Sequence, residues 1–250
     1  MTRRLQRIQK LKKTETRSNI SEYIKGSDET VKQQSKEHYL FGNILVYIKD
    51  PLPDSVSMAN VISTIESVIP ARFAHGLDSV MVGQFDFFEE TETNAFYQDG
   101  AIYVTNDQFN EEDMIDDLVH ELAHVGEQTY GMDLYMDGSI EEEFVGKRKR
   151  LHAILSGNGY NVPEEFSHPT ESPEYSADID EFLYETVGYP VLTTLSMGLF
   201  VSPYGATSLR EYYANGFEEY FLGDKNYLKK ISPMLYNKLE EITYNNQGHE

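Results

Sequence analysis

The chain has 250 residues and a mass of 28.7 kDa, enough for one large domain or two small ones with a real core. Its 42 acidic side chains outnumber its 21 basic ones, giving a net charge of -21 and a pI near 4.6. A surface this acidic repels phosphate backbones and anionic lipids, so we expect the body of the protein to bind neither nucleic acid nor a membrane. Aromatic residues at 12% and hydrophobic residues at 40% predict a folded chain rather than a disordered one.

The chain contains no cysteine. This excludes disulfides, thiolate metal ligands and a cysteine nucleophile, so any metal must be bound by His, Asp or Glu. The longest apolar stretch, 191–201, is well short of the ~20 residues of a membrane-spanning helix. The N-terminus is basic but lacks the apolar segment of a secretory signal, so we expect a cytoplasmic or virion-associated protein, or one exported by another route.

Residues 1–17 form a basic arm with a net charge of +6, whereas the rest of the chain carries -27. Leu5, Ile8 and Leu11 recur within it at helical spacing, which is typical of a short amphipathic helix. A solvated tail is the first interpretation of such an arm, and the alternatives are docking to an acidic protein partner or a larger assembly, binding of nucleic acid, or a targeting role. Residues 18–38 are polar and are interpreted as a linker, so the sequence divides into an arm with its linker over 1–38 and a domain over 39–250.

The first part of the domain, 39–129, has the pattern of a β-α-β-β unit followed by a helix. Alternation, apolar periodicity and turn residues predict a strand at 44–48, a helix at 56–69, a strand at 80–88 and a hairpin that turns at Asp99-Gly100. Asn110 is a good N-cap and three acidic residues follow it, so a helix is expected over 110–129.

The second part, from residue 130 onward, is predicted to be mainly helical. The expected elements are helices at 140–155, 176–189, 208–222 and 233–242, a buried piece at 191–201, and a loop over 156–173. The fold class is therefore α+β, with a small mixed sheet, one long helix after it and a mainly helical C-terminal half.

The expected helix over 110–129 carries the pattern HExxH, at His120, Glu121 and His124. Side chains four residues apart lie on one face of a helix, so the two imidazoles can bind one metal ion while the glutamate between them reaches a water on that ion. This pattern on an amphipathic helix that follows a strand and a hairpin is typical of the zincin-like peptidases. The alternative is a pair of exposed histidines that flank a solvated glutamate.

A catalytic zinc normally has three protein ligands, so a third must be found. The longer pattern HExxHxxGxxH fails, because Glu127 and Tyr130 occupy the positions that require Gly and His. A glutamate from a later helix is the remaining common solution. Two candidates compete: Glu142, 18 residues after His124, and Glu211, 87 residues after it.

The segment around Glu211 resembles the anthrax lethal factor-like zinc peptidases, the group that includes the clostridial Pro-Pro endopeptidases. These proteins combine HExxH with a later Tyr-Gly and, seven residues after that tyrosine, a ligand glutamate followed by two aromatic residues and an alanine. The matching residues here are Tyr204-Gly205, Glu211, Tyr212-Tyr213 and Ala214. The resemblance covers roughly residues 40–245.

The resemblance implies that His120, His124 and Glu211 bind Zn²⁺, that Glu121 is the general base and that Tyr204 stabilises the transition state. Taken alone, Glu211 has another interpretation, since it completes a capping box that begins at Ser208.

Two departures from the family pattern stand out. Residues 130–203 are longer than the corresponding family segment and form a helical insertion, a lid or a substrate-selecting element, between the HExxH helix and the Tyr/Glu segment with its C-terminal helices, 204–250. Where the family has a carboxylate four residues after the ligand glutamate, the chain has Asn215, which can still hydrogen-bond a histidine but raises its basicity less.

The sequence therefore predicts a zinc-dependent endopeptidase that acts on a protein or peptide substrate. Its chemistry would use water activated by zinc, with Glu121 as the base. An extended substrate is expected to pair with the stretch around 95–97 or with the strand at 101–105. The alternative is a structural or interaction protein, such as a component of a virion or toxin particle, that uses the same fold as a scaffold.

Overall fold

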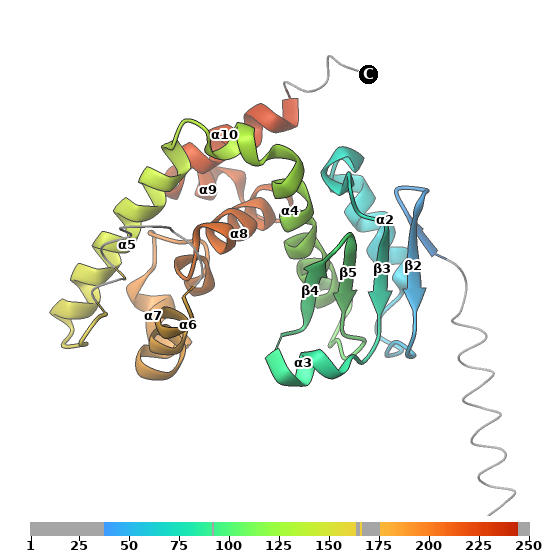
Figure 1. Cartoon of the computed structure of the whole chain (residues 1–250), viewed down its shortest axis with the longest axis horizontal. Helices are drawn as coiled ribbons and strands as arrows, with labels where there is room; N and C mark the ends of the chain where they lie inside the picture. Colours follow the sequence, from blue (N-terminus) through green and yellow to red (C-terminus); the bar gives the residue numbers. More distant parts are fainter. Residues whose placement is uncertain (1–37, 92, 164–165, 167–175, 245–250) are drawn as a thin grey trace, which may run out of the picture.

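A computed structural model of the chain describes residues 38–91, 93–163, 166 and 176–244. The expected basic arm, most of the linker and much of the expected loop at 156–173 lie outside these residues. Figure 1 shows the sheet and helix α2 (Met58–Val68) together at one side of the molecule. The helices that follow residue 138 lie at the other side, and the long helix α4 (Glu111–Tyr135) lies between the two parts. The α+β class, with a mainly helical C-terminal half, is confirmed.

The sheet has five strands in the order β1-β2-β3-β5-β4. Its strands are β1 (His38–Leu40), β2 (Ile44–Ile48), β3 (Ser79–Val82), β4 (Ala95–Gln98) and β5 (Ala101–Val104). The three central strands run parallel, whereas β1 and β4 pair antiparallel at the two edges. Strand β1 was not expected. The hairpin of β4 and β5 is confirmed, and its turn residues Asp99 and Gly100 both have positive φ, as a tight hairpin requires.

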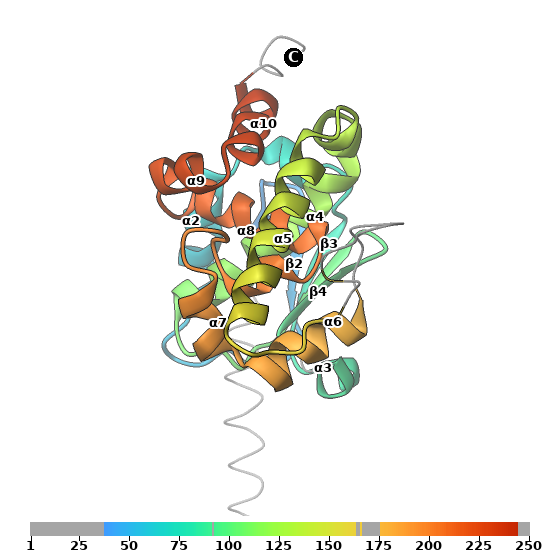
Figure 2. The ribbon, with the colours of Figure 1, turned by 90° about the vertical axis from the view of Figure 1, so that its left-hand side faces the viewer.

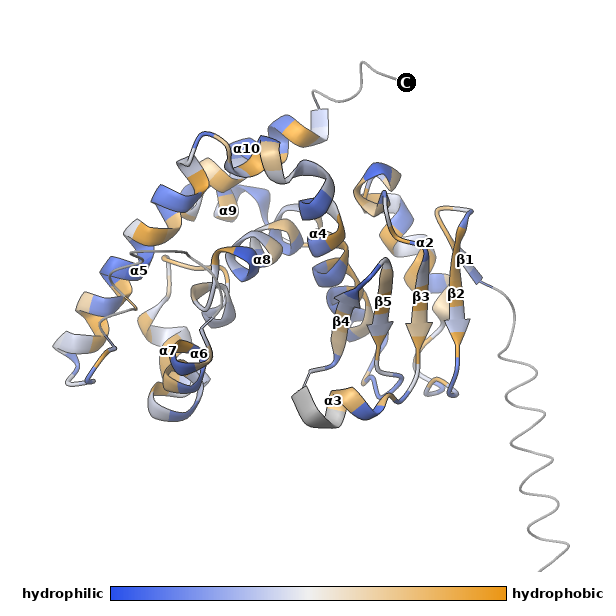
Figure 3. Cartoon of the chain, viewed as in Figure 1, coloured by the Kyte–Doolittle hydropathy of each residue, from blue (hydrophilic) through white to orange (hydrophobic). Residues whose placement is uncertain are grey.

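One face of the sheet is covered by helix α2 (Met58–Val68) and by the long helix α4 (Glu111–Tyr135). Burial alternates along β2, where Ile44 and Val46 are buried while Leu45 and Tyr47 are exposed. This period of two is the reason why the segment forms a strand with a single buried face. Figure 3 shows mainly hydrophobic strands, whereas hydrophilic and hydrophobic residues alternate along α4 and α5 (Ser139–Gly157).

The expected strand over 80–88 is wrong in its second half. Strand β3 ends at Val82, because the Asp50 carboxylate accepts a hydrogen bond of 2.9 Å from the backbone N–H of Gln84 and turns the chain. Gly83 lies so close that a Cβ there would be 2.7 Å from Asp50 Oδ2, so the turn needs a residue without a side chain.

After this turn the chain forms a helix, α3 (Asp86–Thr91), and Phe85 directly precedes it. Phe85 and Phe87 both pack edge-on against Tyr103 of β5, at ring-centroid distances of 5.2 and 5.4 Å. Their packing in this cluster, rather than strand alternation, accounts for the run of apolar residues.

The C-terminal half starts with α5 and continues through shorter elements. These are α6 (Ala177–Glu181), the π-helix η3 (Phe182–Val187), α7 (Tyr189–Leu195), the 3₁₀ helix η4 (Pro203–Ala206), α8 (Leu209–Phe221), α9 (Lys225–Ile231) and α10 (Pro233–Tyr244). Figure 2, turned by 90° from Figure 1, shows α5 in front of α8, with α9 and α10 at one end and α6 and α7 at the other.

Three expectations for this half need correction. The single helix expected over 176–189 runs without a break from α6 into the π-helix η3, but it ends at Gly188, whose φ of 80° separates η3 from α7. The expected buried piece at 191–201 is only partly buried, since Met197 is 75% exposed while Leu192 is buried. Helix α9 was not expected, although Asp224 accepts a capping hydrogen bond from the N–H of Asn226.

The two halves meet in a shared core between α4 and α8. Phe73, from a 3₁₀ helix at Ala71–Ala74, packs edge-on against Phe217 of α8 at 5.2 Å and lies 5.3 Å from Tyr130 of α4. Phe73 and Phe217 are fully buried, so truncating either to alanine would cost about 3–5 kcal/mol of stability. None of the helices in the described residues has an apolar stretch long enough to cross a bilayer.

Candidate metal centre

Helix α4 presents the two histidines of the HExxH pattern to the same side. Its start is fixed as expected, because the Asn110 side chain accepts a hydrogen bond of 2.9 Å from the N–H of Asp113. One turn separates His120 from His124, and their ring centroids are 5.1 Å apart. Glu121 and His124 are both buried, which is unusual for polar residues in the middle of a helix.

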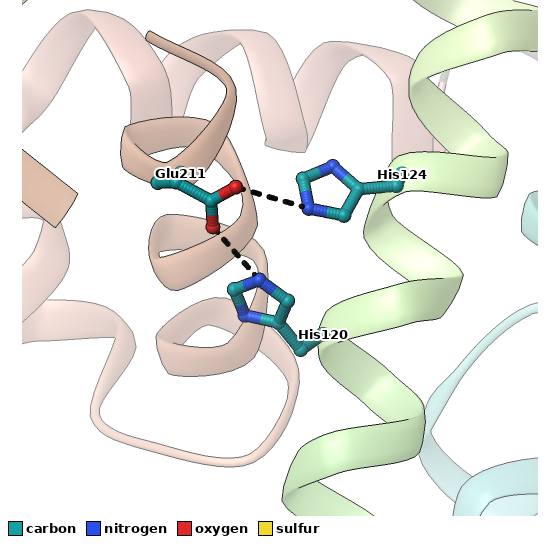
Figure 4. Close-up of side chains that lie close together, drawn as sticks. All are labelled: His120, His124 and Glu211. Atoms are coloured by element: carbon teal, nitrogen blue, oxygen red, sulfur yellow. Dashed lines mark hydrogen bonds and ion pairs between the residues drawn. The ribbon is translucent and has the colours of Figure 1, made fainter. Parts of the chain in front are cut away.

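Glu211, in the first turn of α8, faces these histidines across the contact between the two helices (Figure 4). Its Oε2 atom is 2.9 Å from His120 Nε2, and its Oε1 atom is 3.6 Å from His124 Nε2. One donor atom from each of the three residues lies within 4.8 Å of the others. Glu142, the competing candidate, is exposed on α5 and does not belong to this group.

In each histidine, Nε2 faces Glu211, and the other ring nitrogen, Nδ1, lies near a second carboxylate. His120 Nδ1 contacts Glu218 Oε1 in a short hydrogen bond, and His124 Nδ1 lies 3.6 Å from Glu127 Oε2. Glu127 is itself held by Arg210 Nε at 2.9 Å and by the Tyr135 hydroxyl at 2.5 Å. Carboxylates in such positions fix the orientation of ligand imidazoles and raise their basicity.

Glu218 was not expected at the site, and Asn215 was expected as a residue that can hydrogen-bond a histidine. In the structure, the Asn215 side chain accepts a hydrogen bond from the Ser202 hydroxyl and packs against Gly205, so it supports the segment that carries Tyr204. Glu218 lies seven residues, or about two turns, after Glu211 and therefore on the same face of α8. That seven-residue spacing was the signal in the sequence that could have placed Glu218 near the site.

Burial and charge act in opposite directions on these groups. Burial lowers the pKa of His120, but its hydrogen bonds to Glu211 and Glu218 outweigh burial and hold that pKa well above the ordinary value. Burial raises the pKa of Glu211, but hydrogen bonds from His120 and His124 outweigh it and hold that pKa at about 2. The pKa of Glu121 is raised, chiefly by its burial.

A pocket of about 700 Å³ opens beside the three residues. Residues 95–97 of β4 line one side of it, and Asp180, Tyr184 and Tyr189 line another. Tyr204 contributes from η4, with its ring centroid 6.2 Å from that of His120 and 37% of the residue exposed. Glu121 also lines the pocket. The residues expected to act as ligands, base and transition-state stabiliser therefore all line the same pocket: His120, Glu121, His124, Tyr204 and Glu211.

The three side chains form a group that is compatible with a bound metal ion. Two imidazole nitrogens and one carboxylate oxygen are a common ligand set of catalytic zinc, which leaves a position for a further group on the metal. The Glu218 carboxylate on His120 Nδ1 is the kind of support that such ligands usually have, and Glu127 lies 3.6 Å from His124 Nδ1. Within the described residues, these three side chains are the one group of His, Asp and Glu close enough to share a metal ion.

Comparisons with models of known protein families, with curated proteins and with solved structures give no match for this chain.

Proposed function

We propose that the chain is a zinc-dependent endopeptidase of the lethal factor-like type, with His120, His124 and Glu211 as ligands. The observation that carries this proposal is the convergence of the three side chains from two distant segments beside Glu121, on one wall of a pocket. The resemblance of Tyr204-Gly205 and the residues around Glu211 to that family supports the same assignment.

A zinc ion in this position would act as a Lewis acid, which lowers the pKa of water towards ~7 and polarises a peptide carbonyl. Glu121 borders the same pocket without belonging to the metal-binding group, which suits a general base that takes a proton from water and delivers it to the leaving amine. Tyr204, at the pocket and beside His120, would donate its hydroxyl proton in a hydrogen bond to the developing oxyanion.

The sheet offers one edge to an extended substrate at this pocket. Strand β5 pairs with β3 on one side and with β4 on the other, so it cannot accept another strand. Within the described part of the chain, strand β4 lies at this edge of the sheet, and its residues Ala95, Phe96 and Tyr97 line the pocket. Of the two segments considered for strand addition, β4 is therefore the one that remains.

The test is a comparison of the unsubstituted chain with Glu121→Gln. Both proteins should bind one zinc ion, measured by elemental analysis after dialysis, because Glu121 is not a ligand. The unsubstituted chain should cleave members of a broad peptide library, followed by mass spectrometry. We expect Glu121→Gln to be slower by about 10²- to 10⁴-fold, the usual contribution of a positioned general base.

Equal cleavage rates for the two proteins would exclude Glu121 as the base. If neither protein binds zinc or cleaves any library member, the endopeptidase proposal is wrong and a scaffold function takes its place.

A further inference from the structure

The insertion over 130–203 supplies one wall of the pocket. Asp180 at the end of α6, Tyr184 in the π-helix η3 and Tyr189 at the start of α7 all border it. Asp180 and Tyr184 are four residues apart on a continuous helical segment, so they share a face. The edge strand β4, at which an extended peptide would lie, lines the same pocket.

The three side chains combine an aromatic surface with a carboxylate. The rings of Tyr184 and Tyr189 are 5.6 Å apart between centroids and inclined at 58°, which forms an aromatic corner. Tyr184 is 56% exposed although it belongs to the pocket, so much of its ring is accessible to a ligand. Aromatic faces attract cations, and a carboxylate beside them forms a charge-assisted hydrogen bond with an ammonium or guanidinium group.

The other charges of the pocket favour the same kind of ligand. Among the described residues that line the pocket, Arg210 is the one basic side chain apart from the two histidines, and its Nε atom donates a hydrogen bond of 2.9 Å to Glu127. Glu121 adds a further carboxylate to the lining. The chain as a whole carries -21, so its long-range field also attracts basic peptides and repels acidic ones.

We propose that the wall formed by Asp180, Tyr184 and Tyr189 is a specificity site that binds a lysine or arginine side chain of the peptide substrate. This inference rests on the proposed function, since it assigns the substrate class of the same pocket. It also gives the insertion a role, because all three residues come from it.

The experiment measures binding separately from hydrolysis. The full-length Glu121→Gln chain, loaded with zinc, is titrated against fluorescein-labelled nonapeptide pools, blocked at both ends, with one fixed central residue and mixed residues elsewhere. The fixed residue is lysine, arginine, norleucine or glutamate, and binding is followed by fluorescence anisotropy. We expect the lysine and arginine pools to bind roughly ten- to a hundredfold more tightly than the norleucine pool, as for one hydrogen-bonded charge, and the glutamate pool to bind worst.

Two variants in the same background locate this preference. Asp180→Asn should reduce it to threefold or less, and Tyr184→Ala should weaken it without removing it. The matched control is Asp178→Asn, which removes the same charge from the exposed surface of α6, outside the pocket lining, and should keep the full preference. Because Tyr184 is largely exposed, its replacement should leave the fold intact.

Equal binding of all pools, no binding of any pool, or a preference that survives Asp180→Asn would overturn this inference. The same pools are also incubated with the unsubstituted chain. Selective binding of basic pools without cleavage would contradict the endopeptidase function and retain the specificity site. Cleavage without a preference for basic residues would support the endopeptidase function and contradict the specificity site.

Discussion

The backbone and the side chain of Glu211 make two different contacts. Its N–H donates a hydrogen bond of 3.1 Å to the Ser208 hydroxyl, so the expected cap of helix α8 is present. Its carboxylate does not turn back to the cap but reaches His120 and His124. The capping and ligand interpretations of Glu211 are therefore compatible, because they concern different atoms.

This separation allows a test with opposite outcomes for two neighbouring residues. Glu211→Ala keeps the capping N–H but removes the carboxylate, so we expect zinc affinity to fall sharply while the helix persists. Ser208→Ala should do the opposite, with zinc still bound and about 0.5–2 kcal/mol of stability lost with the cap. Competition with a chromogenic chelator measures the affinity, and urea unfolding measures the stability. Glu142→Ala is the control for loss of a glutamate and should behave like the unsubstituted chain.

The carboxylate at Glu218 is expected to tune the metal site through His120. Glu218→Gln keeps a side chain of the same size but removes the negatively charged carboxylate that contacts His120 Nδ1. Zinc affinity should therefore decrease by about 10- to 100-fold. The chelator competition used for Glu211 gives the readout, and the exposed Glu142→Gln is the matched control. An affinity within twofold of the unsubstituted chain would show that Glu218 does not support the ligand.

The site residues that could be predicted from the sequence are those that belong to a short sequence pattern. His120, Glu121 and His124 follow from helical spacing, and the resemblance added Tyr204 and Glu211. The seven-residue spacing places Glu218 on the face of α8 that carries Glu211, but its contact with His120 also depends on how α8 is rotated against α4, which the spacing alone does not determine. For the same reason, Asn215 could not be assigned to Ser202 from the sequence.

Helix α8, which carries Glu211, is also held in place by a close contact with α10. A Cβ at Gly216 would lie 2.2 Å from Leu235 Cδ2 and 3.0 Å from its Cγ, and Leu235 is fully buried. The absence of a side chain at this position allows the two helices to approach each other. The position of Glu211 therefore depends on packing at the opposite face of its own helix.

Gly216→Ala should destabilise the protein, because overpacking costs typically about 1–3 kcal/mol and exceeds the gain in helix propensity of about 0.5–1 kcal/mol. The control is Gly146→Ala in the interior of α5, where a Cβ meets nothing within 4 Å. That variant should be more stable by about 0.5–1 kcal/mol. Urea denaturation of both proteins gives the comparison, and equal stabilisation of the two would contradict the steric argument.

Elements were predicted best where a cap and a periodic stripe occur together. Asn110 and Ser208 mark the starts of α4 and α8 as expected, and both accept the capping hydrogen bond. The expected strand over 80–88 was wrong only after Val82, where the apolar residues pack in an aromatic cluster instead of a strand. Periodicity cannot distinguish these cases over so few residues.

The candidate metal centre joins the two halves of the molecule. His120 and His124 belong to the helix that covers the sheet, whereas Glu211 belongs to the helical C-terminal half. The α+β class could be predicted from local patterns, but the pocket walls could not. Asp180, Tyr184 and Tyr189 border the pocket only because the insertion folds back towards β4, and contacts this distant in the sequence leave no local signal.

Since the ligands come from both halves, zinc should stabilise the whole fold rather than one helix. A ligand that binds only the folded state adds about 4 kcal/mol when its free concentration is about 1,000 times Kd. For a chain of this size, with about 2–4 °C per kcal/mol, the melting temperature should then rise by roughly 8–16 °C over that of the protein treated with EDTA. Differential scanning calorimetry measures the shift, and readdition of zinc should restore it. Glu211→Ala should show little or no shift, whereas Glu142→Ala should show the full one. A full shift in Glu211→Ala would mean that zinc stabilises the fold from another site.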